Sequence, residues 1–406
     1  MSAASPAAGL RADATVISVV GFAHGTSHFF HFVVPPLFPY LMREFGLNYT
    51  QAGALMTAFF VVSGVGQALA GFAVDRFGAL RVLCAGEGFL VLACLLLAAS
   101  SSYPMLLAAM AVAGLGNAVF HPADFTVLNR RVSETRLGHA FSVHGLSGTL
   151  GWAAAPIFVL AIAELAGWRW AVIGAGAVLA VALACLYAFR GQLDDRRVPH
   201  ADAPKREGGT FAFLGVPLVW MCFAFFLVST AAFGALQNFA PPLLSQGYGT
   251  TLAFATTALT AYLVGAAGGS FTGGFFASRG SHQDRLMAFV LAIAAACAAG
   301  LATVALPAWC VPLLMATMGF SVGFSSPSRD ILVRRAATTT FGAGAFGRIY
   351  GFVYSGIDIG LAVAPILFGI LMDTGRAHLV LWGVAGLQCL AIATVIAVGS
   401  RSRARA

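Results

Sequence analysis

Three histidines recur at helical spacing near the start of the chain, at His24, His28 and His31. At about 100° per residue, a helix places all three within roughly 60° of arc on one face. Imidazole titrates near neutral pH, so this row can carry protons or contact a charged substrate. Histidines four residues apart can instead chelate a transition metal. In a third interpretation, each ring only bonds a neighbouring carbonyl or hydroxyl group.

A second polar face carries Asn117, His121 and Asp124, again at spacings of four and three residues. Asp124 is a candidate for a carboxylate that takes up and releases a coupled proton, with His121 as its neighbour. The alternative is a structural ion pair or cap near a helix end, because Arg130 and Arg131 follow closely. The residue pattern leaves both interpretations open.

These polar residues stand in a chain that is otherwise apolar. Of its 406 residues, 59% are hydrophobic and 9% are charged, whereas about a quarter of the residues of a soluble domain are charged. An ionisable side chain at the centre of a bilayer costs about 2.5–3.5 kcal/mol on insertion scales. We therefore expect the histidines and Asp124 to meet in a shared aqueous cavity rather than face lipid.

The elements that position them are apolar runs long enough to cross a bilayer as helices. Backbone groups in lipid must be bonded within their own segment, and long continuous runs favour helices over the short alternating strands of a barrel. The sequence thus predicts an all-α integral membrane protein with twelve transmembrane helices. The predicted spans are 14–41, 51–74, 80–99, 104–128, 140–166, 169–189, 212–244, 251–277, 286–306, 309–333, 348–372 and 379–398.

Basic residues are unequally distributed between the two sets of breaks that separate these spans. The richer set is expected in the cytoplasm, together with both termini. The formal net charge of +8 then reflects topology, and no nucleic-acid partner is expected. The outer breaks carry Arg43, Arg169 and Arg376, whereas the inner breaks and the tail carry Arg76, Arg81, Arg130, Arg131, Arg136, Arg190, Arg196, Arg197, Lys205, Arg206, Arg279, Arg285, Arg334, Arg335, Arg401, Arg403 and Arg405.

Several other classes of protein are disfavoured. The first apolar run is too long for a cleavable signal peptide. The seven cysteines are dispersed without a C-x-x-C pair, which is typical of small core residues rather than metal ligands or disulfides. No nucleophile constellation or phosphate loop is evident, so we expect no enzyme, no cofactor and no dedicated metal centre.

The chain reads as two similar halves. A polar stretch at 190–210 predicts a cytoplasmic linker between six-helix bundles at 1–189 and 211–406. Matching features recur in the same order and at a nearly constant offset in both halves. They are Pro35-Pro36 with Pro241-Pro242, Pro122 with Pro327, and Gly151 and Pro156 with Gly360 and Pro365. A parallel repeat of two such halves is an architecture of secondary transporters, with substrate bound near the membrane midplane.

The loop after the second span reads GFAVDRFGALR, from Gly71 to Arg81. It resembles the G-x-x-x-D-R-x-G-x-R signature of the major facilitator superfamily. The resemblance implies that Asp75 and Arg76 form a charged latch at the cytoplasmic surface. The corresponding stretch of the second half keeps Arg279 but has Ser278 in place of the Asp.

Within that superfamily the chain resembles the fosmidomycin-resistance family. The resemblance lies in the first-span histidine, LFPYLMREFGLNYTQAGAL at 37–55, the stretch from Gln67 to Arg76, and GLGNAVFHP at 114–122. It implies proton-driven drug efflux in a bacterial inner membrane. The chain departs from the family at Ala123, where a Glu is usual, and its carboxylate follows one position later.

The resemblance also places the first, fourth, seventh and tenth helices around a central cavity. Gln237 and Asn238 of the seventh are then candidate hydrogen-bonding partners for a substrate. Aligning Pro122 with Pro327 sets Asp124 against Arg329. This pair can form a salt bridge that substrate or a proton breaks. Arg329 can alternatively bind an anionic substrate, since guanidinium matches carboxylate and phosphonate geometry.

Further charged residues are candidates for gating roles. Asp330 directly follows Arg329 and can compete for its charge, while Asp358 can pair with Arg348. Glu87 also lies deep in a predicted span. His144 stands on a glycine-spaced face with Gly145, Gly148 and Gly151, a loose resemblance to the antiporter pattern of helix five without its usual Gly-Pro pair.

Together these features predict a monomeric secondary transporter that works by alternating access in the lipid bilayer. We expect proton-coupled export of a small organic compound or drug. The alternatives are a proton-coupled importer of an organic anion and a divalent-metal carrier that uses the first-span histidines.

Overall fold

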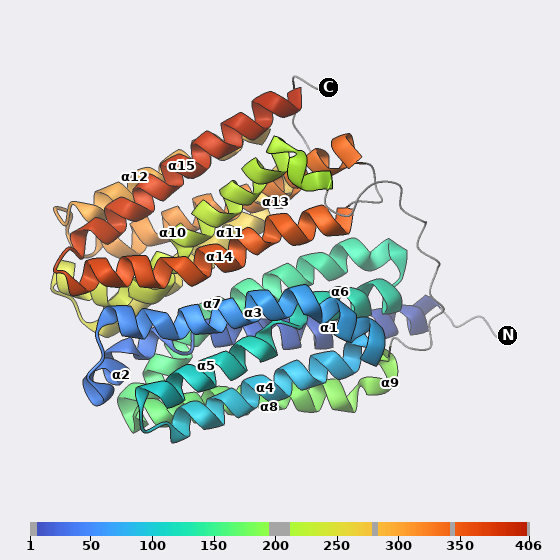
Figure 1. Ribbon diagram of the computed structural model, residues 1–406, viewed down its shortest axis with the longest axis horizontal. Helices are drawn as coiled ribbons and strands as arrows, with labels where there is room; N and C mark the ends of the chain where they lie inside the picture. Colours follow the sequence, from blue (N-terminus) through green and yellow to red (C-terminus); the bar gives the residue numbers. More distant parts are fainter. Residues whose placement is uncertain (1–5, 195–211, 278–282, 342–345, 404–406) are drawn as a thin grey trace. The chain divides into compact units, whose positions relative to one another are not determined.

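The computed structural model describes residues 6–194, 212–277, 283–341 and 346–403, which form helices joined by short turns (Figure 1). Within these ranges, the side chains at 6–8, 68, 71, 72, 75, 134, 138, 212, 213, 274, 275, 277, 283, 327, 330–341, 346–351 and 398–403 are not described. The predicted linker therefore lies mostly outside the described residues, as do the side chains of Asp75, Asp330 and Arg348.

The first half of the chain supplies most of the elements that surround the histidines. They are α1 (Pro6–His31), η1 (Pro35–Leu37), α2 (Phe38–Phe45), α3 (Tyr49–Phe77), α4 (Ala79–Ala99), α5 (Tyr103–Asn117), α6 (Phe120–Arg131), η2 (Glu134–Arg136), α7 (Leu137–Ala166), α8 (Trp168–Ala188) and α9 (Arg190–Leu193).

The second half contributes a comparable series of helices. They are η4 (Ala212–Gly215), α10 (Pro217–Tyr248), α11 (Leu252–Ala277), α12 (Gln283–Ala302), α13 (Cys310–Phe341), α14 (Phe346–Asp373) and α15 (His378–Arg403). By contacts, the chain divides into two compact units. Unit 1 comprises Met1–Gly46 and Ala58–Ala201, and unit 2 comprises Leu47–Thr57 and Asp202–Ala406.

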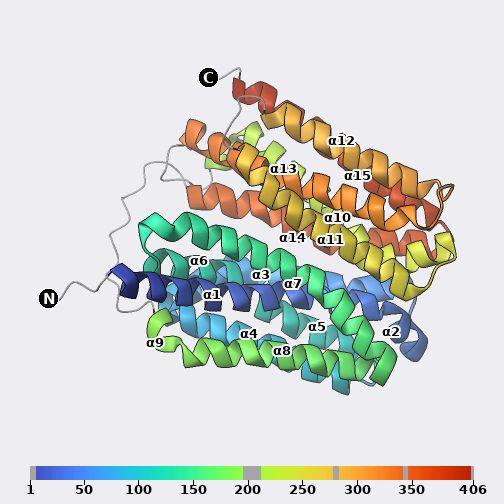
Figure 2. The ribbon, with the colours of Figure 1, turned by 180° about the vertical axis from the view of Figure 1, so that it is seen from behind.

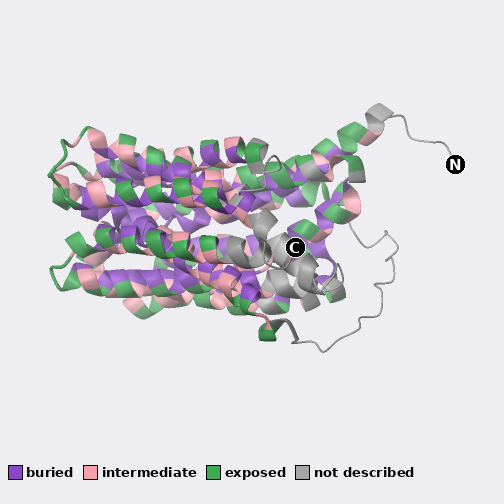
Figure 3. Cartoon of the chain, turned by 90° about the horizontal axis from the view of Figure 1, so that it is seen from above, coloured by how far each residue is buried: buried purple, intermediate pink, exposed green. Residues whose placement is uncertain are grey.

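The all-α membrane fold predicted from the sequence is confirmed. Ten helices in the described ranges are long and apolar enough to cross a bilayer. The two predicted spans outside that set, 51–74 and 309–333, coincide with α3 and α13. Large apolar side chains are exposed on the helices, such as Val65 at 63% and Leu165 at 88% exposure, as is suited to a lipid environment. Figure 3 shows exposed and buried residues alternating along the helices.

Two predicted spans are interrupted where they carry prolines. The span predicted at 14–41 consists of α1, η1 and α2, with Pro35 and Pro36 opening η1. The span predicted at 104–128 consists of α5 and α6, with a turn between them. Pro122 has no N–H, so the carbonyl four residues earlier, in that turn, loses its helical donor. Both interruptions lie next to the polar faces singled out by the sequence.

Glycines bring α1 and α7 into close contact in unit 1 (Figure 2). A side chain at Gly151 would collide with the backbone carbonyl of Gly25 and the backbone nitrogen of Phe29. Small residues of this kind let two membrane helices approach at backbone distance. The close approach sets the histidines of α1 directly against α7.

Polar clusters tie the helices of unit 1 at its two ends. Asp13 accepts hydrogen bonds from Arg136 Nε at 2.7 Å and from Ser133 Oγ at 2.6 Å. Near the opposite helix ends, Glu44 pairs with Arg169 at 2.6 Å and accepts the Trp168 indole N–H at 2.6 Å. The apolar core and the histidines lie between these clusters, together with a few buried polar residues such as Glu87, Asn117 and Asp124.

Candidate functional site

Five imidazole rings converge inside unit 1. His24, His28 and His31 come from α1, His121 comes from α6 and His144 comes from α7. The His24 ring stacks on His144 with 3.5 Å between centroids and lies 4.3 Å from His28. The His28 ring stacks in turn on His31 at 5.0 Å. The sequence placed the α1 and α6 histidines in one cavity, and the structure brings all of them together.

A hydrogen-bonded chain joins the cluster to the buried carboxylate of Asp124. His24 Nδ1 lies 2.9 Å from the backbone carbonyl of His144, and since a carbonyl only accepts, His24 donates. His144 Nε2 lies 3.0 Å from Asp124 Oδ2. The second oxygen, Asp124 Oδ1, has no hydrogen-bond partner among the described residues. Asp124 is fully buried, so this carboxylate is only partly satisfied.

His31 belongs to a different and more complete network. The Trp152 indole N–H donates to His31 Nδ1 at 3.2 Å, and His31 Nε2 lies 2.9 Å from Asn117 Oδ1. Since indole can only donate, Nδ1 accepts and Nε2 carries the ring proton. Asn117 Nδ2 then donates to Ser63 Oγ at 2.9 Å. His31 therefore has a fixed tautomer with both nitrogens engaged.

Other nitrogens of the cluster are buried without such partners. His24 Nε2 and both ring nitrogens of His28 lack a hydrogen-bond partner within the described parts of the chain. Buried polar atoms of folded proteins are nearly always bonded to protein or water, and an orphan needs an explanation such as a bound ion, water or ligand. The cluster thus has unused acceptor capacity at His24 and His28.

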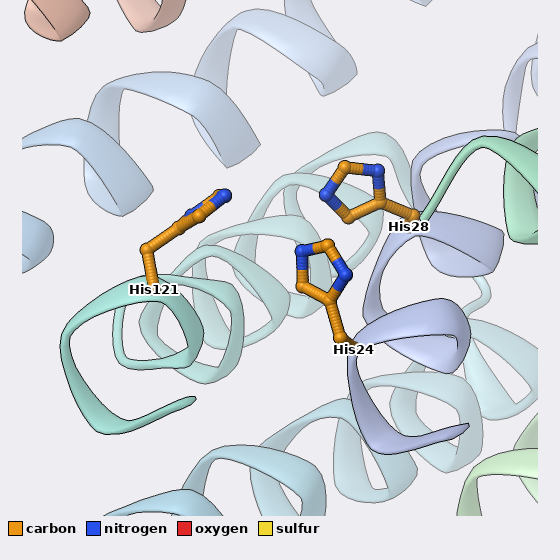
Figure 4. Close-up of side chains that lie close together, drawn as sticks. All are labelled: His24, His28 and His121. Atoms are coloured by element: carbon orange, nitrogen blue, oxygen red, sulfur yellow. The ribbon is translucent and has the colours of Figure 1, made fainter. Parts of the chain in front are cut away.

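Two sets of these side chains have donor atoms close enough together to be candidate metal ligands. Donor atoms of His24, His28 and His121 lie within 4.8 Å of one another, and Figure 4 shows their rings turned toward a common space. Donor atoms of His24, Asp124 and His144 meet the same limit. The arrangement can accept protons, hydrogen-bond a polar substrate, or hold a transition-metal ion.

A second buried carboxylate lies elsewhere in the same unit. Glu87 on α4 is fully buried, and its Oε1 lies 2.6 Å from the Thr26 hydroxyl. The same hydroxyl lies 2.7 Å from the carbonyl of Ala23. One hydroxyl proton serves only one of these two acceptors. Glu87 therefore forms a polar site on the side of α1 that faces α4.

The predicted residues of unit 2 form their own environment. Gln237 and Asn238 of α10 are fully buried, and Asn238 Nδ2 donates to the Gly234 carbonyl at 2.7 Å. Arg329 of α13 is half-buried, with its guanidinium 4.5 Å from the centre of the Phe226 ring. Asp358 of α14 is also half-buried.

Some predicted pairs join a residue of unit 1 to a residue of unit 2, and others include a side chain that is not described. The pairing of Asp124 with Arg329 joins unit 1 to unit 2 and stays a prediction. The latch of Asp75 with Arg76 stays a prediction too; Arg76 itself is exposed, 5.3 Å from the centre of the Phe77 ring. Asp358 with Arg348, and the competing role of Asp330, are likewise untested.

Two residues of the cluster, His144 and Trp152, were not among the site residues predicted from the sequence. His144 stands on the glycine-spaced face of α7, and that spacing was its only signal. Trp152, which bonds His31 and lies 4.6 Å from the His28 ring centroid, carried no signal at all. It is two turns beyond His144 on the same helix, so the close packing of α1 on α7 brings it to the cluster.

The sequence is similar to a known protein family and to several individual transporters. The model of the Major Facilitator Superfamily matches residues 20–347, which is most of the chain. An uncharacterized MFS-type transporter of Bacillus subtilis (strain 168), YfnC, is 30% identical over 36% of this chain and 36% of its own. The fosmidomycin resistance protein of Escherichia coli (strain K12) is 27% identical over 39% of this chain and 40% of its own. The alignments thus span well under half of these relatives.

A third relative, a probable sulfoacetate transporter of Cupriavidus necator, SauU, is 30% identical over 37% of this chain and 35% of its own.

A solved structure has the same fold along the whole chain. A bacterial homologue of the human lysosomal transporter Spinster, in an inward-facing and unoccupied conformation, superposes with a TM-score of 0.73 over 99% of this chain and 98% of its own. At 12% identity this likeness concerns the fold alone. The signature around Arg76, the helical architecture and the family match agree: the chain belongs to the major facilitator superfamily of membrane transporters.

Proposed function

We propose that this protein is a proton-coupled secondary transporter that exports a small organic compound across a bacterial inner membrane by alternating access. The two bundles, at 1–189 and 211–406, are its moving parts, and 190–210 links them. Both termini lie in the cytoplasm and the protein works as a monomer.

The observation that carries the proposal is the environment of Asp124. This carboxylate is fully buried on a helix that belongs to a candidate membrane span, and one of its oxygens has no partner within the described residues. A charge held there without full compensation is costly, whereas a carboxyl group that binds and releases a proton in each cycle has a reason to be retained. Asp124 is the proton-coupling residue of this proposal, and His144, at 3.0 Å, is its immediate partner.

The substrate side of the proposal uses polar groups of both halves. In unit 1 these are the rings of His28 and His121 and the network of His31 with Asn117. In unit 2 they are Gln237, Asn238 and Arg329. Asp75, Arg76, Asp330, Arg348 and Asp358 are assigned to gating.

Export is favoured by the names of the relatives, which include a fosmidomycin resistance protein and a multidrug resistance protein B homolog of Mycobacterium tuberculosis. A second candidate is import of an organic anion. It is supported by the half-buried guanidinium of Arg329 and by the probable sulfoacetate transporter among the relatives.

The test uses inside-out membrane vesicles with an acidic interior, whose pH gradient is followed by the quenching of an acridine dye. Fosmidomycin and sulfoacetate are added as separate probes. An exporter that exchanges fosmidomycin for protons should dissipate the gradient in wild-type vesicles. Asp124→Asn, which keeps the shape and removes the charge, should abolish this dissipation.

The matched control is Glu164→Gln, a carboxylate replacement at an exposed position near the end of α7. It should behave as the wild type. Equal dissipation by Asp124→Asn and the wild type, at equal amounts of folded protein, would remove Asp124 from the mechanism. Gradient-driven uptake of sulfoacetate into right-side-out vesicles, without any response to fosmidomycin, would establish the import alternative.

A further inference from the structure

Two of the five clustered histidines, His24 and His28, have buried ring nitrogens without a hydrogen-bond partner in the described chain, and a donor nitrogen of His121 lies close to theirs. We propose that His24, His28 and His121 bind a divalent transition-metal ion inside unit 1. The ion belongs to the class that prefers imidazole ligands, namely Zn²⁺, Co²⁺, Ni²⁺ or Cu²⁺. This site is independent of the proton-coupling role proposed for Asp124.

The hydrogen bond of His24 determines which of its ring nitrogens can bind an ion. Its Nδ1 donates to the backbone carbonyl of His144 at 2.9 Å, which leaves the Nε2 lone pair without a proton. That lone pair is buried and has no partner in the described chain. A metal-binding histidine nearly always donates its second ring N–H to a carbonyl or carboxylate in this way. His24 is therefore already held as a ligand.

His28 also has ring nitrogens that are available to an ion. Both of its ring nitrogens are buried without a hydrogen-bond partner among the described residues. A buried imidazole without partners loses the hydrogen bonds that it makes to water in the unfolded chain, and this loss is unfavourable. One nitrogen on a metal ion would relieve this loss and bring His28 into the same centre as His24, whose ring lies 4.3 Å away.

Gly148 of α7 leaves space for the rings of His24 and His28. A Cβ atom at this position would lie 2.8 Å from His24 Cε1 and 2.8 Å from His28 Nδ1. Both distances are shorter than side-chain carbons tolerate. The missing side chain thus allows the two rings to lie side by side under α7.

The geometry permits closure around an ion. The three donor nitrogens lie within 4.8 Å of one another, while two nitrogens on a tetrahedral zinc at roughly 2.0–2.1 Å lie about 3.4 Å apart. Small rotations of the side chains close this gap, and His121 on α6 approaches from the side opposite α1 (Figure 4). Three histidines leave the fourth position open to water or to a donor atom of a small ligand.

The other histidines are poorer ligands for reasons visible in their bonds. His31 uses Nδ1 with Trp152 and Nε2 with Asn117. His144 uses Nε2 with Asp124 Oδ2, so one donor atom of each of these two residues is already engaged in the alternative set of His24, Asp124 and His144.

The experiment measures metal binding by the full-length protein in detergent. The protein is purified through an affinity tag that contains no histidine, stripped with a chelator and equilibrated with Zn²⁺ or Co²⁺. Elemental analysis should find one ion per chain. Co²⁺ should show the strong visible absorption of tetrahedral nitrogen coordination rather than the weak absorption of the hydrated ion.

Variants locate the ion. His28→Ala and His121→Ala should each weaken binding by about 100-fold or more, since even the partners behind metal ligands contribute 10- to 100-fold. Gly148→Ala should weaken binding by displacing the rings. His139→Ala, at an exposed histidine of the same helix α7, is the matched control and should bind as the wild type.

Two results would overturn the proposal. One is a wild-type protein that binds no ion, and the other is binding that survives in both His28→Ala and His121→Ala. Size-exclusion profiles and unfolding temperatures identify any variant that fails to fold. In that case His28→Gln and His121→Gln, which retain polarity, take its place. No gradient or substrate enters this experiment, so its failure leaves the test of Asp124 untouched.

Discussion

At the scale of single residues, the cluster separates into a satisfied and an unsatisfied part. His31, Asn117 and Ser63 form a chain in which each described donor meets an acceptor at 2.9 Å. His24, His28 and Asp124 each retain a buried atom without a partner in the described chain. A fully hydrogen-bonded network in the interior stabilises a fold. Buried polar atoms without a hydrogen-bond partner are instead typical of places where ions, protons or ligands bind. The hydrogen-bonded residues His31, Asn117 and Ser63 therefore hold the unsatisfied part of the cluster in position.

The role of the satisfied part is testable at Asn117. Asn117→Ala removes the acceptor of His31 Nε2 and the donor to Ser63, and leaving buried groups unpaired destabilises a protein by about 1–3 kcal/mol. We expect a clearly lower unfolding temperature in detergent, measured by dye-based thermal unfolding. Asn129→Ala is the control, since Asn129 is exposed and bonds only the Phe125 carbonyl of its own helix among the described contacts. Equal unfolding temperatures for the two variants would refute a structural role of the chain.

The sequence predicted which histidines share a face but not which of them are bonded. Helical spacing alone brings His24, His28 and His31 to one side of α1. The distinction between His31 and the other two depends on Trp152 and Asn117, which come from α7 and α5. No local pattern reports such partners, because they are set by how helices far apart in the chain pack.

At the scale of elements, proline and glycine decide how the helices serve the site. The sequence predicted continuous spans at 14–41 and 104–128, whereas the structure interrupts both. Proline marks each interruption, yet α10 continues through Pro241 and Pro242. A proline pattern therefore indicates where a membrane helix can break, while the surrounding packing decides whether it does.

The contact between α1 and α7 gives a prediction at this scale. Gly151→Ala places a methyl group against the backbone of Gly25, and such overpacking costs about 1–3 kcal/mol. Gly145→Ala is the matched control on the same helix, because a Cβ there meets nothing within 4 Å. We expect Gly151→Ala to unfold at a lower temperature and Gly145→Ala to match the wild type. A Gly151→Ala protein as stable as the control would mean that the two helices can separate freely.

At the scale of the whole molecule, the ion pairs between arginine and carboxylate in the described chain lie near helix ends, whereas the carboxyl groups of Glu87 and Asp124 are buried within unit 1. Asp13 with Arg136 and Glu44 with Arg169 lie near opposite ends of the helices of unit 1. The number, order and type of the helices followed from apolar length and the repeat of prolines. The packing of the helices around the histidines did not, because periodicity fixes the face of a helix and not its neighbour.

The predicted orientation in the membrane can be measured with cysteine labelling. In a variant whose native cysteines are replaced, Arg376→Cys and Arg190→Cys each introduce one exposed thiol. A membrane-impermeant maleimide should label Arg376→Cys in intact cells and Arg190→Cys only after permeabilisation, because basic loops stay in the cytoplasm. The reverse pattern would invert the topology assigned here.

The hydrogen bond from the His24 ring to the α7 backbone also ties occupancy to motion. Its acceptor is the carbonyl of His144, so a slide of α7 along α1 by one helical residue, about 1.5 Å, would withdraw it. The ring proton would then be free to move to Nε2 and block that atom. An ion or ligand bound to Nε2 therefore opposes the slide of α7. By thermodynamic reciprocity, the slide lowers the binding affinity for that ion or ligand. The position of α7 along α1 and the affinity of the bundle for a bound ion or ligand are therefore coupled through the His24 ring.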